Sequence, residues 1–235
     1  MLIPILGHAL RFALAGAVVT VATLSPAWSQ DTDKNQEPTA LVTAANASLG
    51  NFMRDPEMKW FQQNIGRAKG VLIAPEVGKV GFIVGGSGGR AVLVMKNPKG
   101  KWTGPAFYTL ATGSVGLQAG VSVSEMVTLV MTDKGINSLL SNSFKMGADA
   151  SVAAGPVGAG AGSDVVADLI TFSRAKGVYG GVNLDGTVVK VNSDWNAAFY
   201  NAPGVQPTDI LIRGKVSNRN SVALLNTVTK AAAGK

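Results

Sequence analysis

Between residues 71 and 131 the chain alternates short runs of β-branched and aromatic residues with glycine-rich stretches. Such runs are typical of β-strands, and the stretches 75–78 and 85–89 between them are typical of turns. The first three runs are Val71–Ile73, Gly81–Val84 and Ala91–Met95. Because small side chains at many strand positions allow tight curvature, the pattern predicts a strongly curved antiparallel β-sheet or a partly closed barrel.

Helical periodicity flanks this region on both sides. Thr39–Met53 and Asn218–Ala233 carry apolar residues three or four positions apart, which predicts an N-terminal and a C-terminal helix. Further strands are predicted at Pro105–Leu110, Ser114–Val123, Val127–Met131, Val165–Phe172, Gly177–Leu184 and Val188–Val191, and short helices at Asp133–Ser141 and Trp195–Tyr200. We therefore expect an α+β fold in which helices flank a glycine-rich, curved antiparallel sheet.

Residues 1–29 have the features of a secretory signal peptide. Arg11 precedes the apolar run Phe12–Leu24, and small residues at Ala27 and Ser29 favour cleavage after Ser29. The run is shorter than the roughly 20 residues that span a membrane, so a retained membrane anchor is the less favoured alternative. We expect an exported protein whose leader is removed.

The predicted mature chain divides into a tail and one domain. Residues 30–38 are polar and lack periodicity, which predicts a flexible N-terminus. Residues 39–235 contain all of the predicted helices and strands and show no fixed repeat, so we expect a single domain there.

The composition excludes several kinds of chemistry. The chain has no cysteine, and its one histidine, His8, lies within the predicted leader. Thiolate metal sites, cysteine nucleophiles, His–metal sites and Ser-His-Asp catalysis are therefore excluded for the mature protein. We expect no catalytic residues, no metal site and no cofactor.

Positive charge is concentrated in one segment. Between Lys59 and Lys101 there are eight basic residues and a single acidic one, Glu76, on a chain whose net charge is +7. A basic segment beside a nearly neutral remainder indicates an anionic partner or, as the simpler alternative, a solvated face. Aromatic residues near this segment would suit nucleic acid, but the predicted export argues against such a partner, and none is expected.

An amphipathic helix is predicted directly after Asp55-Pro56, since aspartate is a good N-cap and proline suits the first helical turn. Met58, Phe61 and Ile65 fall on one face of this helix, with Lys59 and Trp60 beside them. Two interpretations remain open: the helix packs on the core of its own domain, or it lies at a membrane interface.

Paired carboxylates are the remaining route to an enzyme. Two acids facing a cleft could hydrolyse a glycoside, but a sequence cannot show which acids face one another. The candidates are Glu76, Glu125, Asp149, Asp164, Asp168, Asp185 and Asp194.

Six ordered blocks of sequence resemble the SYLF lipid-binding domain. The first block, residues 68–86, reads AKGVLIAPEVGKVGFIVGG and is similar to the opening signature of that family. The other blocks are 102–108, 113–120, 127–132, 147–156 and 172–186, followed by Phe199-Tyr200. Together they extend over residues 40–205, nearly all of the predicted mature chain.

The resemblance implies a non-enzymatic lipid-binding module. Eukaryotic members are fused to Src-homology or FYVE domains, with phosphoinositide and actin binding described for the family, whereas bacterial members are exported and stand alone. The family's lipid contact corresponds here to Lys59, Trp60, Arg67, Lys69 and Lys79, with Arg90 in a less constrained tail of the signature. Charge clustering alone adds Lys96, Lys99 and Lys101.

The sequence thus predicts an exported protein, periplasmic or secreted, that attaches peripherally to anionic phospholipid. Basic side chains would attract headgroups, and the helix around Trp60 would bury apolar atoms in the interface. The alternatives are a structural or protein-interaction module of the envelope, or a carrier of an internal ligand held in a cavity lined by alanine and glycine.

Overall fold

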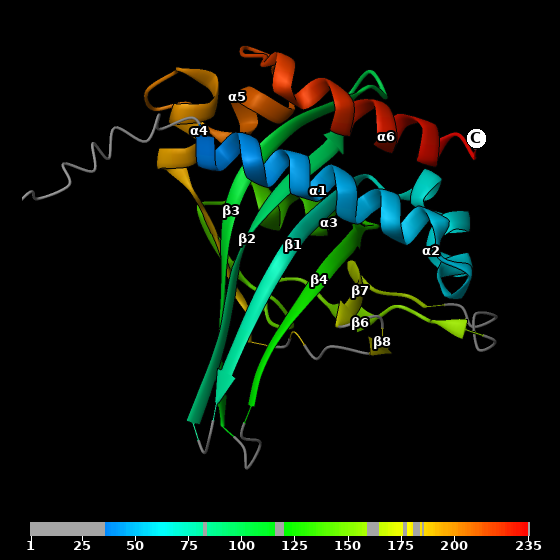
Figure 1. Cartoon of the computed structure of the whole chain (residues 1–235). Helices are drawn as coiled ribbons and strands as arrows, with labels where there is room; N and C mark the ends of the chain where they lie inside the picture. Colours follow the sequence, from blue (N-terminus) through cyan, green and yellow to red (C-terminus); the bar gives the residue numbers. More distant parts are fainter. Residues whose placement is uncertain are drawn as a thin grey trace, which may run out of the picture. The chain divides into compact units, whose positions relative to one another are not determined.

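A nine-stranded sheet forms the centre of the fold (Figure 1). The computed structural model describes residues 36–81, 84–115, 120–158, 165–175, 178–180, 184 and 186–234. The strand order is β5-β9-β3-β2-β1-β4-β7-β6, with β8 paired to β7, and only the β6–β7 pair is parallel. The strands are β1 Gly70–Gly81, β2 Val84–Lys96, β3 Trp102–Val115, β4 Gly120–Val130, β5 Ser143–Lys145, β6 Val152–Ala154, β7 Leu169–Ala175, β8 Val178–Gly180 and β9 Val188–Val191.

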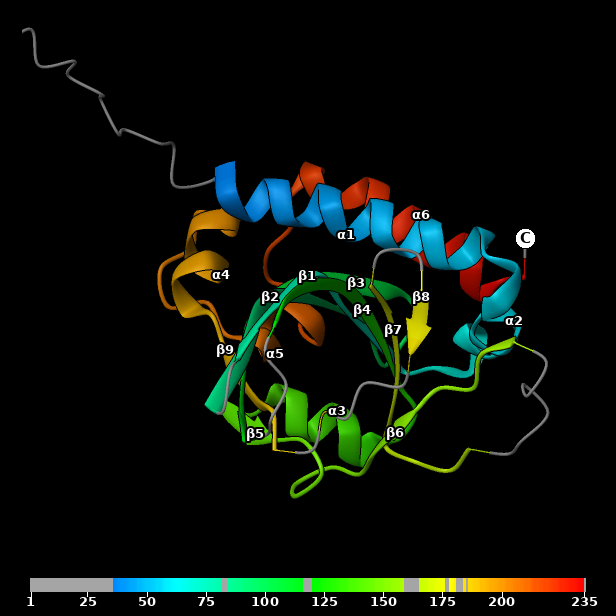
Figure 2. The ribbon, with the colours of Figure 1, turned by 60° about the horizontal axis from the view of Figure 1, so that its bottom comes forward.

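The sheet is curled into a half-barrel, which confirms the predicted α+β class and the predicted curvature. Helices α1 and α6 pack together on the outer side of the arch, and α3 lies on its inner side (Figure 2). The helical segments are α1 Gln36–Arg54, η1 Pro56–Met58, α2 Lys59–Asn64, η2 Ile65–Arg67, α3 Asp133–Leu140, α4 Ser193–Tyr200, α5 Pro207–Leu211, η4 Arg219–Ser221 and α6 Val222–Ala232.

The glycine-rich stretches of the first two strands differ from the prediction. The stretches 75–78 and 85–89 were predicted to be turns, but they lie inside β1 and β2. The register of β1 shifts between Ile73 and Glu76, so Pro75 sits at an irregularity where its missing N–H does not interrupt the ladder. Glycine and proline usually indicate a turn. Here the backbone of β1 stays extended instead, because partner strands pair with it on both sides.

The sheet has a buried half and a projecting half. Near the helices both faces are covered, and Val71–Ala74, Ala91–Met95 and Met126–Val130 are buried. Farther along the same strands, side chains such as Lys79 and Val123 are exposed, and these strand ends extend past the helices in Figure 1. The core is therefore confined to the half of the sheet that the helices cover.

Local signals predicted most helices well. Asp55 caps η1 by accepting a hydrogen bond from Glu57 N, as expected, and α1, α3, α4 and α6 lie where periodicity indicated. Helix α1 begins at Gln36, so the last three residues of the stretch 30–38 are helical rather than flexible. Helix α5 was not predicted, although Pro207 at its start and the Gln206–Asp209 capping box are sequence signals for it. The predicted leader and its cleavage site lie outside the described residues.

Candidate lipid-binding surface

Five of the predicted basic residues gather at one end of the sheet. They lie where η2 leads into β1 and where β2 turns into β3, and Lys96 N donates to Lys69 O across 2.9 Å between the two segments. We call this surface the basic end; it consists of Arg67, Lys69, Lys96, Lys99 and Lys101. Lys69 and Lys96, 27 positions apart in sequence, thus meet because β1 and β2 are antiparallel neighbours.

Three of the five cations have no counter-ion among the described residues. Arg67, Lys99 and Lys101 are exposed and form no ion pair in that part of the chain. The turn that carries the two lysines is well held, because Asn97 Oδ1 accepts hydrogen bonds from Lys99 N and Lys101 N, each 3.0 Å long. The turn therefore presents two positive charges on a fixed backbone.

The other two cations of the basic end already have partners. Lys69 Nζ lies 2.8 Å from Asp133 Oδ1 at the start of α3. Lys96 Nζ donates to Gly66 O at 2.6 Å and lies 5.2 Å from the centre of the Trp102 ring. Their contribution to anion binding is therefore partly offset by these partners.

The remaining predicted residues lie elsewhere. Lys59 is exposed at the start of α2, and Lys79 is exposed on the projecting half of β1, opposite Ser87 and Ser122. Arg90 lies on β2 with its guanidinium 4.4 Å from the centre of the Trp195 ring. The structure thus divides the predicted site instead of forming one patch from all nine residues.

The apolar face of the α2 region packs on the core. Met58, Phe61 and Ile65 are fully buried, and Trp60 is only 8% exposed. The ring of Phe172 on β7 lies 5.9 Å from that of Trp60 and 5.3 Å from that of Phe61. The structure therefore favours the first interpretation of this helix, because the ring of Trp60, which the resemblance placed in the lipid contact, is buried against Phe172 of β7.

Lys230 is a basic residue that the sequence reasoning did not select. It is exposed in the last turn of α6, a helix that ends against η2, since a Cβ on Gly66 would lie 2.6 Å from Ala232 O. The sequence did carry a signal for Lys230. A basic residue in the last turn of a predicted helix interacts favourably with the helix dipole.

Three of the candidate catalytic acids, Glu125, Asp149 and Asp168, make structural contacts, and Asp194 is exposed in the first turn of α4. Glu125 on β4 accepts hydrogen bonds from Ser48 on α1 at 3.0 Å and from Nε of Arg174 on β7 at 2.9 Å. Its neighbour in the fold, Glu76, is exposed, and Asp149 accepts the N–H of Lys145 within a turn. Asp164 and Asp185 lie outside the described residues.

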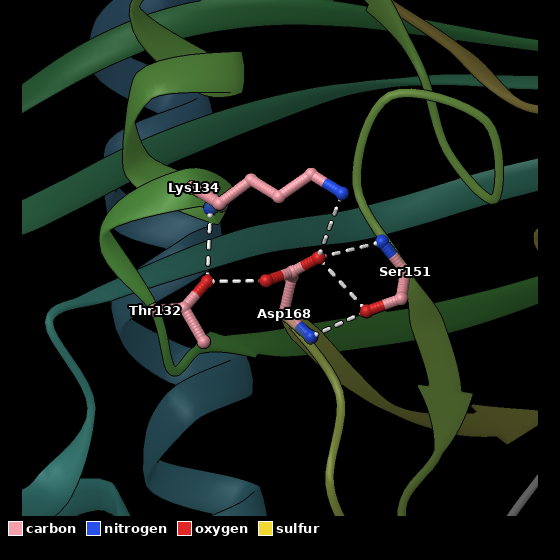
Figure 3. A network of polar contacts seen from close by, with 5 residues as sticks. Thr132, Lys134, Ser151 and Asp168 are labelled. Carbon is pink, nitrogen blue, oxygen red and sulfur yellow. Dashed lines mark hydrogen bonds and ion pairs between the residues drawn. The ribbon is translucent and has the colours of Figure 1, made fainter.

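Asp168 joins three segments in a polar network (Figure 3). Its carboxylate accepts hydrogen bonds from Thr132 Oγ1 and from both Oγ and N of Ser151, and Lys134 Nζ lies 3.7 Å away. The Thr132 hydroxyl, with help from Ser151 and Lys134, lowers the pKa of Asp168 despite the opposing effect of burial. Thr132 also caps α3 by accepting a hydrogen bond from Gly135 N, so the network holds separate segments of the fold together.

Other titratable groups are also structural. Hydrogen bonds from Lys215 and Arg213 lower the pKa of Asp209 to about 2. Burial raises the pKa values of Tyr108 and Tyr200, whose hydroxyls donate to Leu139 O and Pro105 O.

Among the described residues, no group of three histidine, cysteine or acidic side chains could hold a metal. The described helices include none that is both long and apolar enough to cross a membrane.

The described residues thus form an α+β domain, a curled antiparallel half-barrel with packed terminal helices and a basic end. A family model described as "Ysc84: Las17-binding protein actin regulator" matches residues 111–232, slightly more than half of the chain. The chain belongs to this family, the Ysc84 or SYLF domain family, which confirms the resemblance. The SYLF domain is a lipid-binding domain, and the family is generally non-catalytic.

Two relatives illustrate the similarity. The chain is 29% identical to the human SH3 domain-containing YSC84-like protein 1 over 152 residues, which cover 63% of this chain and 44% of the human protein. It is 29% identical over 141 residues to LAS seventeen-binding protein 3 of Saccharomyces cerevisiae, covering 57% of this chain and 30% of the yeast protein. The chain thus spans less than half the length of the curated relatives it matches.

Proposed function

We propose that this protein binds anionic phospholipid at a membrane surface through the basic end. The supporting observation is that Arg67, Lys99 and Lys101 are exposed at the end of the sheet where η2 meets the β2–β3 turn, with no counter-ion in the described ranges. Each lysine or arginine near an anionic membrane contributes about 1 kcal/mol, so these three contribute about 3 kcal/mol. Such attachment is reversible and sensitive to salt.

The proposed attachment is electrostatic and non-enzymatic. It does not use the apolar face of the α2 region, since those side chains are buried against β7. Lys230, exposed in the last turn of α6, is a further positive charge on a helix that ends against η2. We further propose that the chain is exported to the periplasm or beyond and that residues 1–29 are removed there. Mass spectrometry of the protein from its native envelope would then find Gln30 at the N-terminus.

Co-sedimentation with liposomes tests the lipid proposal. Phosphatidylcholine vesicles with increasing phosphatidylglycerol should bind the protein increasingly well at low salt and poorly at high salt. The double variant Lys99→Glu/Lys101→Glu should weaken binding at least tenfold, because it replaces two attractions with two repulsions at the basic end.

A charge-matched control separates a local surface from the net charge of the molecule. Lys145→Glu/Lys190→Glu changes the net charge equally but alters exposed lysines on β5 and β9. This control should retain most of the binding. Equal losses in both double variants, or no binding to any vesicle at low salt, would contradict the proposal.

A further inference from the structure

A groove runs beneath α1 along the outer face of the sheet. Its volume is about 700 Å³. Ala40, Ala44 and Ala47 of α1 form one wall, and glycines of β1 and β2 form the floor. Its wall extends from Glu37 to Ser48, about 16 Å at the rise of an α-helix, which matches about five residues of extended chain.

One position of the groove floor, Gly78, is more open than its own packing requires, whereas a Cβ on Gly88 would lie 3.2 Å from Leu110 O and one on Gly89 would lie 2.4 Å from Glu76 O. At Gly78 a Cβ would meet nothing closer than Gly88 O at 4.0 Å, and the φ angle of Gly78 is not positive. Glycine in a strand destabilises it relative to alanine, and it commonly marks a place where another backbone approaches closely. Nothing within the described structure approaches Gly78 in this way.

The charge of the groove is opposite to that of the whole chain. Glu37, Glu76 and Glu125 line it together with one cation, Arg90, on a chain of net charge +7. Arg174 neutralises Glu125, but Glu37 and Glu76 are exposed and form no ion pair with any described residue. Trp195 closes one end of the groove, with the guanidinium of Arg90 against its ring.

We propose that this groove binds an extended, basic segment of a partner polypeptide. Backbone and small side chains of the segment lie on the glycine floor, and its lysines or arginines reach Glu37 and Glu76. The carboxylates disfavour the phosphate of a lipid headgroup, so this site is distinct from the basic end. The basic end and the groove carry opposite charges, so an anionic membrane engages the basic end and not the groove. The protein attached to a membrane in this way still offers the groove to a partner.

Fluorescence anisotropy with a labelled peptide of five Lys–Ala repeats tests the proposal. The full chain should bind this peptide at low salt and should not bind a Glu–Ala peptide of the same length. Glu76→Lys should weaken binding at least tenfold, whereas Glu57→Lys, which changes the net charge equally at an exposed position on η1, should change it less than twofold.

Two variants that fill the groove test its shape without altering charge. Gly78→Phe on the floor and Ala44→Phe on the wall should each weaken peptide binding at least tenfold. The second variant keeps the test decisive if the first does not fold. Both should still sediment with anionic liposomes, so failure of the groove proposal and failure of the lipid proposal give different results.

Three outcomes would overturn the proposal. The first is no binding of the Lys–Ala peptide at low salt, and the second is equal weakening by Glu57→Lys and Glu76→Lys. The third is a dimer, detected by light scattering, that Glu76→Lys dissociates, because the groove would then hold a second copy of this chain.

Discussion

At the scale of single residues, Asp168 shows how a polar group stabilises this fold. It connects the end of β4, the start of β6 and the start of β7, three segments that are separate in sequence. Its side chain is only 12% exposed, so its hydrogen bonds are largely sheltered from water. An aspartate in such a position is a structural residue, although sequence alone allowed a catalytic one.

Asp168→Asn should lower the free energy of unfolding by about 2 kcal/mol at pH 7, because it weakens charge-assisted hydrogen bonds. The pKa of Asp168 is lower in the folded state than its unfolded value of about 3.9. Its stabilisation is therefore complete above that value and is lost as the pH falls through the lower, folded pKa. Urea unfolding of both proteins at pH 7 and pH 3 should show a smaller difference at pH 3; an unchanged difference would contradict the assignment. Glu76→Gln, at an exposed site, should change stability by less than about 0.5 kcal/mol.

Two glycines in the same sheet should respond oppositely to alanine. A Cβ on Gly89 would lie 2.4 Å from Glu76 O, next to the irregularity in β1, whereas a Cβ on Gly113 would have no neighbour within 4 Å. Gly89→Ala should destabilise the protein by about 1–3 kcal/mol through overpacking. Gly113→Ala should stabilise it by about 0.4–1 kcal/mol, because it restricts the unfolded chain. Thermal unfolding of the two variants measures both effects, and a shift of the same sign in both would be inconsistent with this account.

At the scale of elements, the α2 region shows how packing decides between two uses of one amphipathic pattern. The same apolar spacing suits a membrane interface or a protein core. Phe172 on β7 resolves the choice, because its ring contacts Trp60 and Phe61 from more than 100 residues away.

Trp60→Ala should therefore act on stability and not on lipid binding. Removal of a buried tryptophan side chain should cost about 3–5 kcal/mol. The protein that remains folded should bind anionic liposomes as the parent does, as measured by co-sedimentation at a temperature where both are folded. A selective loss of liposome binding with unchanged stability would instead restore the interfacial role of this residue.

At the scale of the whole molecule, the compact unit is larger than the segment that identifies the family. The compact unit comprises residues 33–235, whereas the family model matches residues 111–232. The central strands β1 and β2 and the helix α1 all precede the matched segment. The matched segment thus lacks the middle of the sheet on which its other strands pack.

A fragment of residues 111–232 should not unfold cooperatively, whereas a fragment of residues 33–235 should. The shorter fragment lacks Val71–Ala74, which are fully buried, and most of β3, and it leaves one edge of β4 without its partner β1. Circular dichroism during urea titration distinguishes the two fragments. A sharp transition in the shorter fragment would show that its strands form a core by themselves.

The sequence by itself determined the features that depend on neighbouring residues. Periodicity and caps located α1, α3, α4 and α6, and β-branched runs located parts of β1 to β4 and of β7 to β9, but not β5 or β6. Six ordered blocks identified the family, because such blocks preserve the order in which strands and turns follow one another. These signals are local, so they can be read without knowing which segments meet.

Only the tertiary structure decided which segments meet. It showed that Pro75 and the glycines 85–89 continue strands, because partner strands on both sides complete the hydrogen-bonded ladder. It separated Lys79 and Arg90 from the basic end, and it placed the acidic groove between α1 and the sheet. Each of these results depends on pairs of residues far apart in the chain, whose contact follows from the register of the sheet and from the helices packed against it.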